Sequence, residues 1–419
     1  MIEILKKLLF LALMATFFMA GGCDSGGRKT EEGKEKTGLA FVDGSSGLPS
    51  SGQWRQNLAI LDMNSDSHLD ILATARRNAP DEERRPAVWY GNGKGEWTRT
   101  FLDVPSDLTY DYGSIAAADF DGDGIADIGL AMHGQGLKVL KGQKDGKFSD
   151  FSSGIPPLTD FGSRALVASD VNNDGIPDIV AVSEFVMQKK EGLYGGLLRC
   201  SWKGGSWKCE AIGDEKERLG LLADQIVVGD VNGDGNKDIG VATRNHLKDL
   251  IVWLGDGKGG FRPFNKGLTL EKHYNSVAFA DVNKDGRDDL IASISSFTGS
   301  FKGLKVFLSG PDTFTDMSEG LPAGESWSYF AAAGDLDGDG NVEIVAATKE
   351  GGLKVFSLKG NRWNEVKTSG LPEKGLYRIY NMYCFDINKD GRKDIVVIYA
   401  DSNNDNGGIR VFLSAPEKK

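Results

Sequence analysis

The chain has 419 residues, of which 56 are glycine, and a formal net charge of −11 at pH 7. The acidic excess, without any basic stripe, argues against nucleic acid as a partner, because binding to phosphates requires clustered Lys and Arg. Many short Val, Ile, Ala and Phe segments and few amphipathic runs of helix length indicate an all-β protein.

Residues 1–22 have the form of an export signal. Two lysines precede an apolar stretch from Leu8 to Ala20, which is shorter than the roughly 20 residues that span a bilayer but typical of a secretory signal. The segment ends in Ala-Gly-Gly-Cys23, which resembles the lipobox of bacterial lipoproteins. This resemblance implies that Cys23 is lipidated and anchors an exported protein to the cell envelope. The alternative is a plain secretory signal in which Cys23 is incidental.

Residues 23–38 are charged and rich in glycine, and they contain no aromatic residue. Such a segment cannot bury a core, and we expect it to form a flexible tether. The folded domain is therefore expected to comprise residues 39–419.

An acidic phrase of nine residues recurs seven times in this domain. Its clearest copy is Asp119-Phe-Asp-Gly-Asp-Gly-Ile-Ala-Asp127, with oxygen-bearing side chains at positions 1, 3, 5 and 9 and glycine at position 6. Successive copies begin 51 to 60 residues apart. A near-constant period of this size indicates stacked or radial structural units.

Each unit shows a pattern of four short strands around the phrase. In the second unit, small residues precede the phrase at 114–118 and an aliphatic run follows it at 127–131. A third strand is expected at 136–140, and a fourth begins with an aromatic residue and extends over 148–156, as far as Gly-Ile-Pro. Four short antiparallel strands are typical of one propeller blade. The small residues suit an innermost strand, where blades converge.

A hairpin with two cysteines lies in the third unit. Cys200 and Cys209 flank Gly204-Gly205, a pair that favours a two-residue turn. In that register the cysteines form a non-hydrogen-bonded pair with Cα atoms about 4.5 Å apart, which is within disulfide range. We therefore predict a disulfide, with two packed thiols as the alternative.

The last unit lacks a fourth strand, because the sequence ends soon after Phe412, whereas a matching strand begins at Phe41, before the first unit. We expect residues 39–45 to pair with residues 408–414, which leaves no open sheet edge. The sequence thus predicts an all-β, seven-bladed propeller of four-stranded blades, closed by its two ends. The alternative is an open solenoid.

The acidic phrases suit a hard cation, which takes six to eight oxygen ligands at about 2.3–2.6 Å. An EF-hand is excluded, because position 12 falls in apolar strand patterns where an EF-hand requires Glu. The alternative is a set of Asx turns without metal. We expect up to seven Ca²⁺ sites, the weakest being the first, where Ser67 replaces glycine at position 6. The ligand candidates are Asp62, Asn64, Asp66 and Asp70; Asp119, Asp121, Asp123 and Asp127; Asp170, Asn172, Asp174 and Asp178; Asp230, Asn232, Asp234 and Asp238; Asp281, Asn283, Asp285 and Asp289; Asp335, Asp337, Asp339 and Glu343; and Asp386, Asn388, Asp390 and Asp394.

Segments such as 112–128 and 161–179 resemble FG-GAP (VCBS-type) repeats, the blades of the integrin alpha-subunit propeller and of many secreted bacterial proteins. The resemblance implies seven blades with calcium in the loops that join the first and second strands. It does not single out one function, because the family serves adhesion, recognition and scaffolding alike.

No catalytic signature accompanies the repeats. The four histidines do not form a two-His metal spacing, and the chain has no Gly-x-Ser-x-Gly, P-loop or dinucleotide fingerprint. We expect a membrane-anchored, extracytoplasmic module that recognises or adheres to a protein or glycan. The alternatives are a structural component of an envelope complex and an enzyme that acts on polysaccharides or phosphate esters.

Aromatic and arginine residues gather on the segments that link one blade to the next, which should lie opposite the acidic loops. Exposed Tyr, Trp and Arg are favoured in protein and glycan sites. We choose Trp54, Tyr112, Trp327 and Arg378 as candidates for a ligand-binding rim. The alternative is that the rings fill gaps between neighbouring blades.

Overall fold

The computed structural model describes residues 38–183, 196–214, 221, 223–243, 250–268, 274–295, 302–324, 327–401 and 406–416, except the side chains of residues 224, 275, 295, 302 and 327–329. The expected signal, most of the tether and Cys23 lie outside the described residues, and these expectations stay predictions. No helix in the described part of the chain is long and apolar enough to cross a membrane.

The described strands form seven sheets, which we number as blades 1 to 7 in chain order. Blade 1 consists of β2 (Ala59–Leu61), β3 (Asp70–Ala73), β4 (Ala87–Gly91) and β5 (Trp97–Phe101). Blade 2 consists of β6 (Gly113–Ala118), β7 (Asp127–Met132), β8 (Gly136–Gly142) and β9 (Phe148–Asp150). Blade 3 consists of β10 (Ser163–Ser169), β11 (Asp178–Ser183), β12 (Leu197–Trp202) and β13 (Trp207–Ile212). Blade 4 consists of β14 (Ala223–Gly229), β15 (Asp238–Thr243), β16 (Ile251–Gly255) and β17 (Phe261–Pro263). Blade 5 consists of β18 (Tyr274–Ala280), β19 (Asp289–Ser295), β20 (Lys302–Ser309) and β21 (Phe314–Asp316). Blade 6 consists of β22 (Trp327–Gly334), β23 (Glu343–Thr348), β24 (Leu353–Lys359) and β25 (Arg362–Val366). Blade 7 consists of β27 (Arg378–Phe385), β28 (Asp394–Ala400), β29 (Gly407–Ala415), β1 (Leu39–Asp43) and β26 (Thr368–Ser369). A short 3-10 turn, η1 (Asp81–Glu83), is the one helical element in the described residues.

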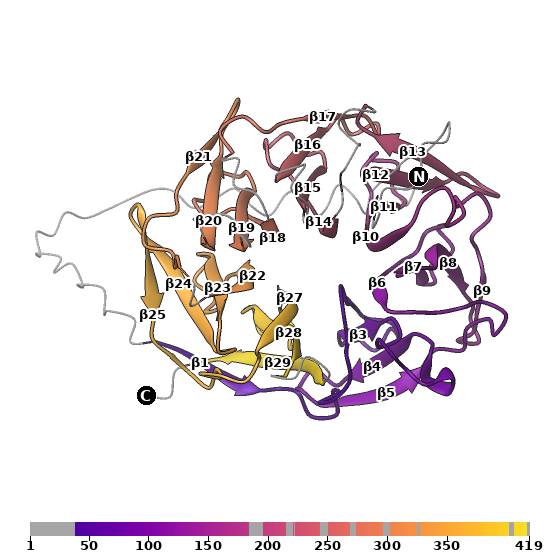
Figure 1. Cartoon of the computed structure of the whole chain (residues 1–419), viewed down its shortest axis with the longest axis horizontal. Helices are drawn as coiled ribbons and strands as arrows, with labels where there is room; N and C mark the ends of the chain where they lie inside the picture. The colour runs from indigo at the N-terminus through magenta and orange to yellow at the C-terminus, as the bar shows by residue number, and fades with distance from the viewer. Residues whose placement is uncertain are drawn as a thin grey trace, which may run out of the picture. The chain divides into compact units, whose positions relative to one another are not determined.

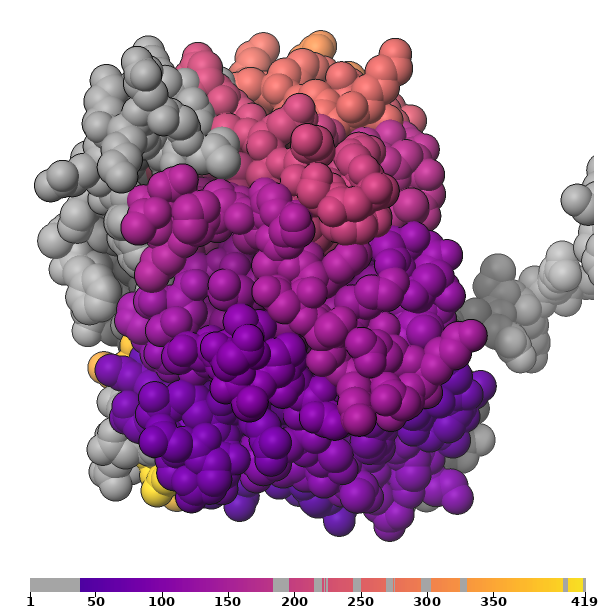
Figure 2. Space-filling model, turned by 90° about the vertical axis from the view of Figure 1, so that its right-hand side faces the viewer, coloured from indigo at the N-terminus to yellow at the C-terminus, as the bar shows by residue number. Residues whose placement is uncertain are grey.

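The blades stand in a ring with their first strands innermost, which confirms the seven-bladed propeller (Figure 1). A cavity of about 440 Å³ lies on the axis and is lined by all seven first strands. Small residues such as Ala59, Ala116 and Ala331 line it, as expected where the blades have least room. From the side, consecutive blades follow one another from indigo to magenta, so chain neighbours are also neighbours in space (Figure 2).

The two ends of the domain meet in blade 7. β1 pairs antiparallel with β29 and places Ala40 opposite Ala415 and Asp43 opposite Phe412. This register confirms that the expected strand pairing closes the ring. β26 adds a short parallel strand on the other side of β1, which the sequence did not indicate.

The fourth strands end sooner than the sequence indicated, since β9 covers 148–150 and not 148–156. The glycine that follows has another role. Gly154 has φ 93°, and a Cβ there would lie 2.2 Å from the carbonyl oxygen of Trp207 in the next blade. The backbone N–H of Trp207 also donates to the carbonyl of Ser153 at 2.8 Å. The Gly-Leu-Pro or Gly-Ile-Pro segment is therefore a contact between neighbouring blades, and Gly47, Gly267, Gly320 and Gly370 lie equally close to the adjacent blade.

Candidate metal centres

The seven acidic phrases occupy equivalent places, between the first and second strands of each blade. The residue at position 9 is in every case the first residue of the second strand: Asp70, Asp127, Asp178, Asp238, Asp289, Glu343 and Asp394. Because all the blades run in the same sense around the ring, the seven loops lie on one face of the propeller. The loops between second and third strands lie on the opposite face.

Backbone hydrogen bonds curl each loop around its first carboxylate. In the second loop, Oδ1 of Asp119 accepts the N–H of Asp123 at 3.1 Å, and Oδ2 accepts the N–H of Gly124 at 2.7 Å. Asp123 in turn accepts the N–H of Ile125 at 2.9 Å. The same bonds to positions 5, 6 and 7 recur in the first loop, from Asp62 and Asp66. The local sequence therefore preforms the loop, as Asx turns do.

The position-9 carboxylate has a second role that the sequence did not reveal. Oδ2 of Asp127 accepts the N–H of Phe120 at 3.0 Å, and Oδ1 accepts the N–H of Gly142 in the third strand at 2.9 Å. Asp289 makes the corresponding bonds to Val282 and Ser309. These carboxylates staple the loop to the blade as well as facing the candidate site.

Burial raises the pKa of these carboxyl groups. The pKa of Asp127 rises to about 6 and that of Asp289 to about 7, although their backbone hydrogen bonds act in the opposite direction. The pKa values of Glu343 and Asp394 rise to about 7 for the same reason. A bound cation favours the charged form of a neighbouring carboxyl group. Metal binding at these loops is therefore expected to release protons near neutral pH.

Two loops gather three carboxylates around one point. Ligand oxygens of Asp119, Asp121 and Asp127 lie within 4.8 Å of one another, and so do those of Asp335, Asp337 and Asp339. These are the two loops that the sequence identified as having four carboxylates. The other five loops carry Asn at position 3, whose amide group is bonded within its own loop in the described cases, as from Asn232 to Asp234 at 2.9 Å.

The second loop passes a direct test of fit for a cation. Oδ1 of Asp121 is buried and has no hydrogen-bond partner, an arrangement that is unfavourable unless another group satisfies the oxygen. The Lys141 ammonium contacts Asp121 and lies 2.7 Å from Asp123, so the loop already attracts positive charge. An all-oxygen donor set of this kind suits a hard divalent cation.

The first loop shows the strain that its sequence predicts. Ser67 at position 6 has φ 71°, and Ser65 at position 4 has φ 61°, in the left-handed region that disfavours side chains. Position 4 is also left-handed in the other loops, with φ 77° at Gly122 and φ 57° at Asn173. The sequence predicts the strain only at position 6, because glycine occurs less regularly at position 4.

Replacing Ser67 with glycine is expected to stabilise the protein by about 1 kcal/mol, because glycine adopts this backbone conformation without the steric penalty of a Cβ atom. Thermal unfolding in the presence of Ca²⁺ measures the change. Ser153→Gly is the control, since Ser153 is an exposed turn residue that is not left-handed. Equal effects of the two substitutions would show that the strain at Ser67 carries no energetic weight.

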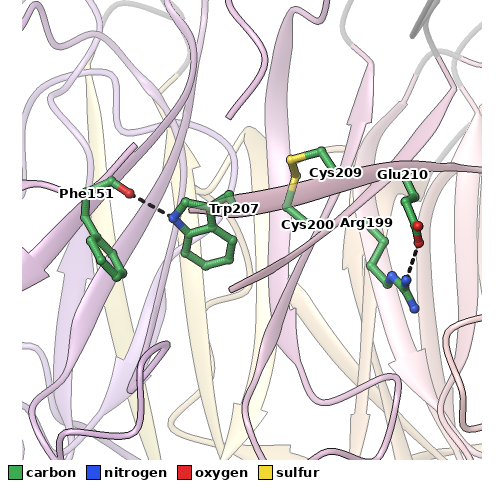
Figure 3. Close-up of a disulfide and its surroundings, with 6 residues drawn as sticks. All are labelled: Phe151, Arg199, Cys200, Trp207, Cys209 and Glu210. Carbon is green, nitrogen blue, oxygen red and sulfur yellow. Dashed lines mark hydrogen bonds and ion pairs between the residues drawn. A yellow bond between two sulfur atoms is a disulfide. The ribbon is translucent and has the colours of Figure 1, made fainter. Parts of the chain in front are cut away.

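The predicted disulfide joins Cys200 and Cys209, whose Cα atoms lie 4.1 Å apart across the hairpin of β12 and β13 (Figure 3). Beside it, the Trp207 indole N–H donates to the carbonyl of Phe151 in blade 2 at 2.8 Å. Arg199, on the other side, pairs with Glu210. The bond therefore fixes the outer hairpin of blade 3 next to its contact with blade 2.

The candidate rim residues have different environments. Trp54 and Tyr112 are buried, with 3% and 6% of their surfaces exposed, and Trp54 packs edge-on against Trp89. Arg378 is exposed, and the side chain of Trp327 lies outside the described residues. The expected rim of exposed aromatic rings is therefore wrong for Trp54 and Tyr112, which fill space inside and between blades.

Comparison with known proteins agrees with this geometry. A profile of the FG-GAP-like repeat matches residues 62–130, 120–181, 230–292 and 335–397, more than half of the chain. The chain is 22% identical to the T-cell immunomodulatory protein homolog of Plasmodium falciparum over 315 residues, 56% of this chain and 42% of that protein. It is 27% identical to integrin alpha pat-2 of Caenorhabditis elegans over 207 residues, 42% of this chain and 17% of that protein. The corresponding integrin of Caenorhabditis briggsae is 31% identical over 171 residues, 34% of this chain and 14% of that protein. The chain spans less than half the length of each of these relatives.

Proposed function

The chain belongs to the FG-GAP-like repeat family, and from this premise we propose that it is a calcium-stabilised propeller that recognises an extracytoplasmic protein or glycan. The observation that carries the calcium part is the buried, unpartnered Oδ1 of Asp121 within a cluster of three carboxylates. Three carboxylates close together repel one another, and a divalent cation removes that repulsion while tying the loop to two strands.

Calcium is the cation that best suits the ligand set. The candidate donors are carboxylate and amide oxygens, with a backbone carbonyl near position 7, and no cysteine occurs in any of the seven phrases. Ca²⁺ accepts six to eight oxygens in adaptable geometry, whereas Mg²⁺ requires a near-ideal octahedron and loses its waters reluctantly. The one histidine in the phrases, His68, already contacts Asp66 within its loop.

The proposal of a recognition function is supported by the different character of the two faces of the ring. The acidic loops use one face, and the linkers and loops of the opposite face are left to vary around a fixed scaffold, which is where binding residues usually reside. Two of the relatives are named integrin alpha, and adhesion is the activity that this likeness supports for the present chain.

The test is binding of the intact protein to arrays of glycans and extracellular proteins, in Ca²⁺ and after chelation. The proposal predicts at least one ligand that is bound in Ca²⁺ and released when EGTA removes the ion. Absence of any ligand on both arrays would contradict the recognition function, and binding that is indifferent to EGTA would contradict its dependence on calcium.

We also propose that Cys23 anchors the protein through a lipid, as the sequence resemblance implies. Cys23→Ala is expected to move most of the protein from the membrane fraction to the soluble extracytoplasmic fraction, because the acyl chain whose burial in the bilayer supplies the anchoring free energy cannot be attached. Fractionation followed by immunoblotting measures this shift. A variant that stays in the membrane fraction would show that Cys23 is not the anchor.

A further inference from the structure

A cavity of about 730 Å³ opens on the face opposite the acidic loops, where blade 1 adjoins blade 7. The linker 47–54 forms one wall, the loop after β3 forms a second, and Asn406 of blade 7 contributes a third side. The volume lies within the 300–1,000 Å³ that is usual for small-ligand sites. None of the candidate metal ligands takes part in its lining.

The cavity has an excess of positive charge. Its lining contains Arg76, Arg77 and Arg99 but a single carboxylate, that of Glu83. Glu83 lies 3.3 Å from Arg76 and 3.8 Å from Arg99, so it is shared between them. Arg77 has no carboxylate partner among the described residues. A chain with a net charge of −11 thus places about two uncompensated positive charges in one concave site.

The positive charge extends from the cavity toward the axis of the ring. The guanidinium of Arg77 lies 5.7 Å from the ring centre of Tyr112, and Arg55 lies at the same distance on that ring. Arg55 and Arg378 lie 5.0 Å and 5.3 Å from the ring of Tyr380. Alternating arginines and tyrosines hold the guanidinium groups in place by cation–π contacts. Nε of Arg55 and the hydroxyl of Tyr380 are buried and lack hydrogen-bond partners.

The aromatic part of the lining is formed by Trp54 and Trp89, which are buried and pack edge-on against each other. The rest of the lining is mostly polar, with Ser50, Ser51 and Asn78, which matches a ligand that is rich in hydroxyl groups better than an apolar one.

We propose that this cavity binds an acidic sugar of the uronate type, with Arg77 and Arg76 holding its carboxylate. Arginine is suited to this role because its planar group binds a carboxylate through two parallel hydrogen bonds. Ser50, Ser51 and Asn78 of the polar wall bond the hydroxyl groups, and the row of Arg55 and Arg378 receives the next acidic residue of a longer saccharide. The inference rests on the recognition function proposed above and specifies its site and ligand class.

Calorimetric titration of the intact protein in Ca²⁺ with a galacturonate trisaccharide tests the proposal. A neutral galactose trisaccharide and triglutamate of matched length separate sugar recognition from charge alone. Binding of the uronate, with the two other probes at least about tenfold weaker, is expected, since both the carboxylates and the hydroxyls contribute hydrogen bonds. Equal or tighter binding of triglutamate would overturn the proposal in favour of an acidic peptide.

Matched variants locate the site. Arg77→Gln is expected to weaken uronate binding about tenfold or more, while Arg262→Gln, an exposed arginine of β17 outside the cavity, leaves it unchanged. Asn78→Ala is expected to weaken binding severalfold by removing a hydrogen-bonding group of the polar wall. Unfolding temperatures confirm that each variant is folded.

Two outcomes distinguish this inference from the proposed function. If the protein binds a ligand on the arrays but does not bind the uronate, or binds it equally well after Arg77→Gln, the assignment of the cavity is wrong and the recognition function stands. If no ligand is found on the arrays and uronate does not bind, both are wrong.

Discussion

Phe41→Ala is expected to lower the free energy of unfolding by about 3–5 kcal/mol, the range for removing a fully buried aromatic side chain. Phe41 has 5% of its surface exposed and packs in the core shared by blades 6 and 7, with Phe412 and Val355. It sits in β1, the one strand that comes from the other end of the domain and closes the ring. The expected loss of stability therefore has two sources, the cavity left by the ring and the weaker packing of the strand that closes the propeller.

Val42→Ala provides the control, because Val42 is the next residue on the same strand but has 55% of its surface exposed. Urea unfolding of both variants in Ca²⁺ measures the difference. The account expects a change of less than about 1 kcal/mol at Val42. Similar small losses at the two positions would show that pairing of the two ends does not hold the ring together.

Chelation is expected to lower the unfolding temperature by a larger amount than any single substitution. A site held at a calcium concentration 100 times its dissociation constant contributes about 2.7 kcal/mol. The two loops with three clustered carboxylates, at Asp119 and Asp335, then contribute about 5 kcal/mol, and the other loops add to this. Calorimetry in Ca²⁺ and in EGTA measures the shift, with Mg²⁺ at the same concentration as the control. An unchanged unfolding temperature would contradict a structural role for the ion.

The fall in unfolding temperature on removal of Ca²⁺ is also expected to become larger as the pH rises. In the ion-free protein, burial raises the pKa of Asp127 to about 6 and of Asp289 to about 7, above the value near 4 in an unfolded chain. Between these values the folded state holds protons that the unfolded state has lost, so ion-free stability falls as pH rises from about 4 to 7. Calcium binding requires the charged forms, and its contribution therefore increases over the same range. Adding Ca²⁺ to ion-free protein at pH 5 and at pH 8 measures this, and a smaller rise in unfolding temperature at pH 8 would oppose it.

The fold could be predicted from the sequence because the same pattern of strands and acidic residues occurs seven times. The regularly spaced acidic phrases predicted the number of blades. The strand at Phe41, before the first unit, predicted the pairing of β1 with β29 that closes the ring. The hairpin register likewise gave the bond between Cys200 and Cys209. In each case the interacting residues are related by a local rule, either strand periodicity or turn geometry.

Contacts between blades could not be derived in the same way. Gly154, which follows β9, packs against the backbone of Trp207, more than 50 residues away in the chain. No local sequence pattern predicts that contact. The burial of Trp54 has the same origin, since Trp54 packs in a core that includes Val396 and Ile398 of blade 7. Tyr112 likewise meets Arg77 of blade 1, whose guanidinium lies 5.7 Å from its ring centre. In the candidate sites, the sequence predicts the ligand positions, which stay predictions. It did not indicate the hydrogen bond from the N–H of Gly142 to Asp127, which joins residues of different strands.

Diffraction from a crystal grown in Ca²⁺, with the anomalous signal of the ion measured, tests the central claim most directly. We expect calcium peaks in the loops that begin at Asp119 and Asp335, each with oxygen ligands at about 2.3–2.6 Å. We further expect Oδ1 of Asp121, which has no hydrogen-bond partner, to be one of these ligands. A closed ring whose seven loops contain only water at saturating Ca²⁺ would contradict the proposal that calcium stabilises the propeller.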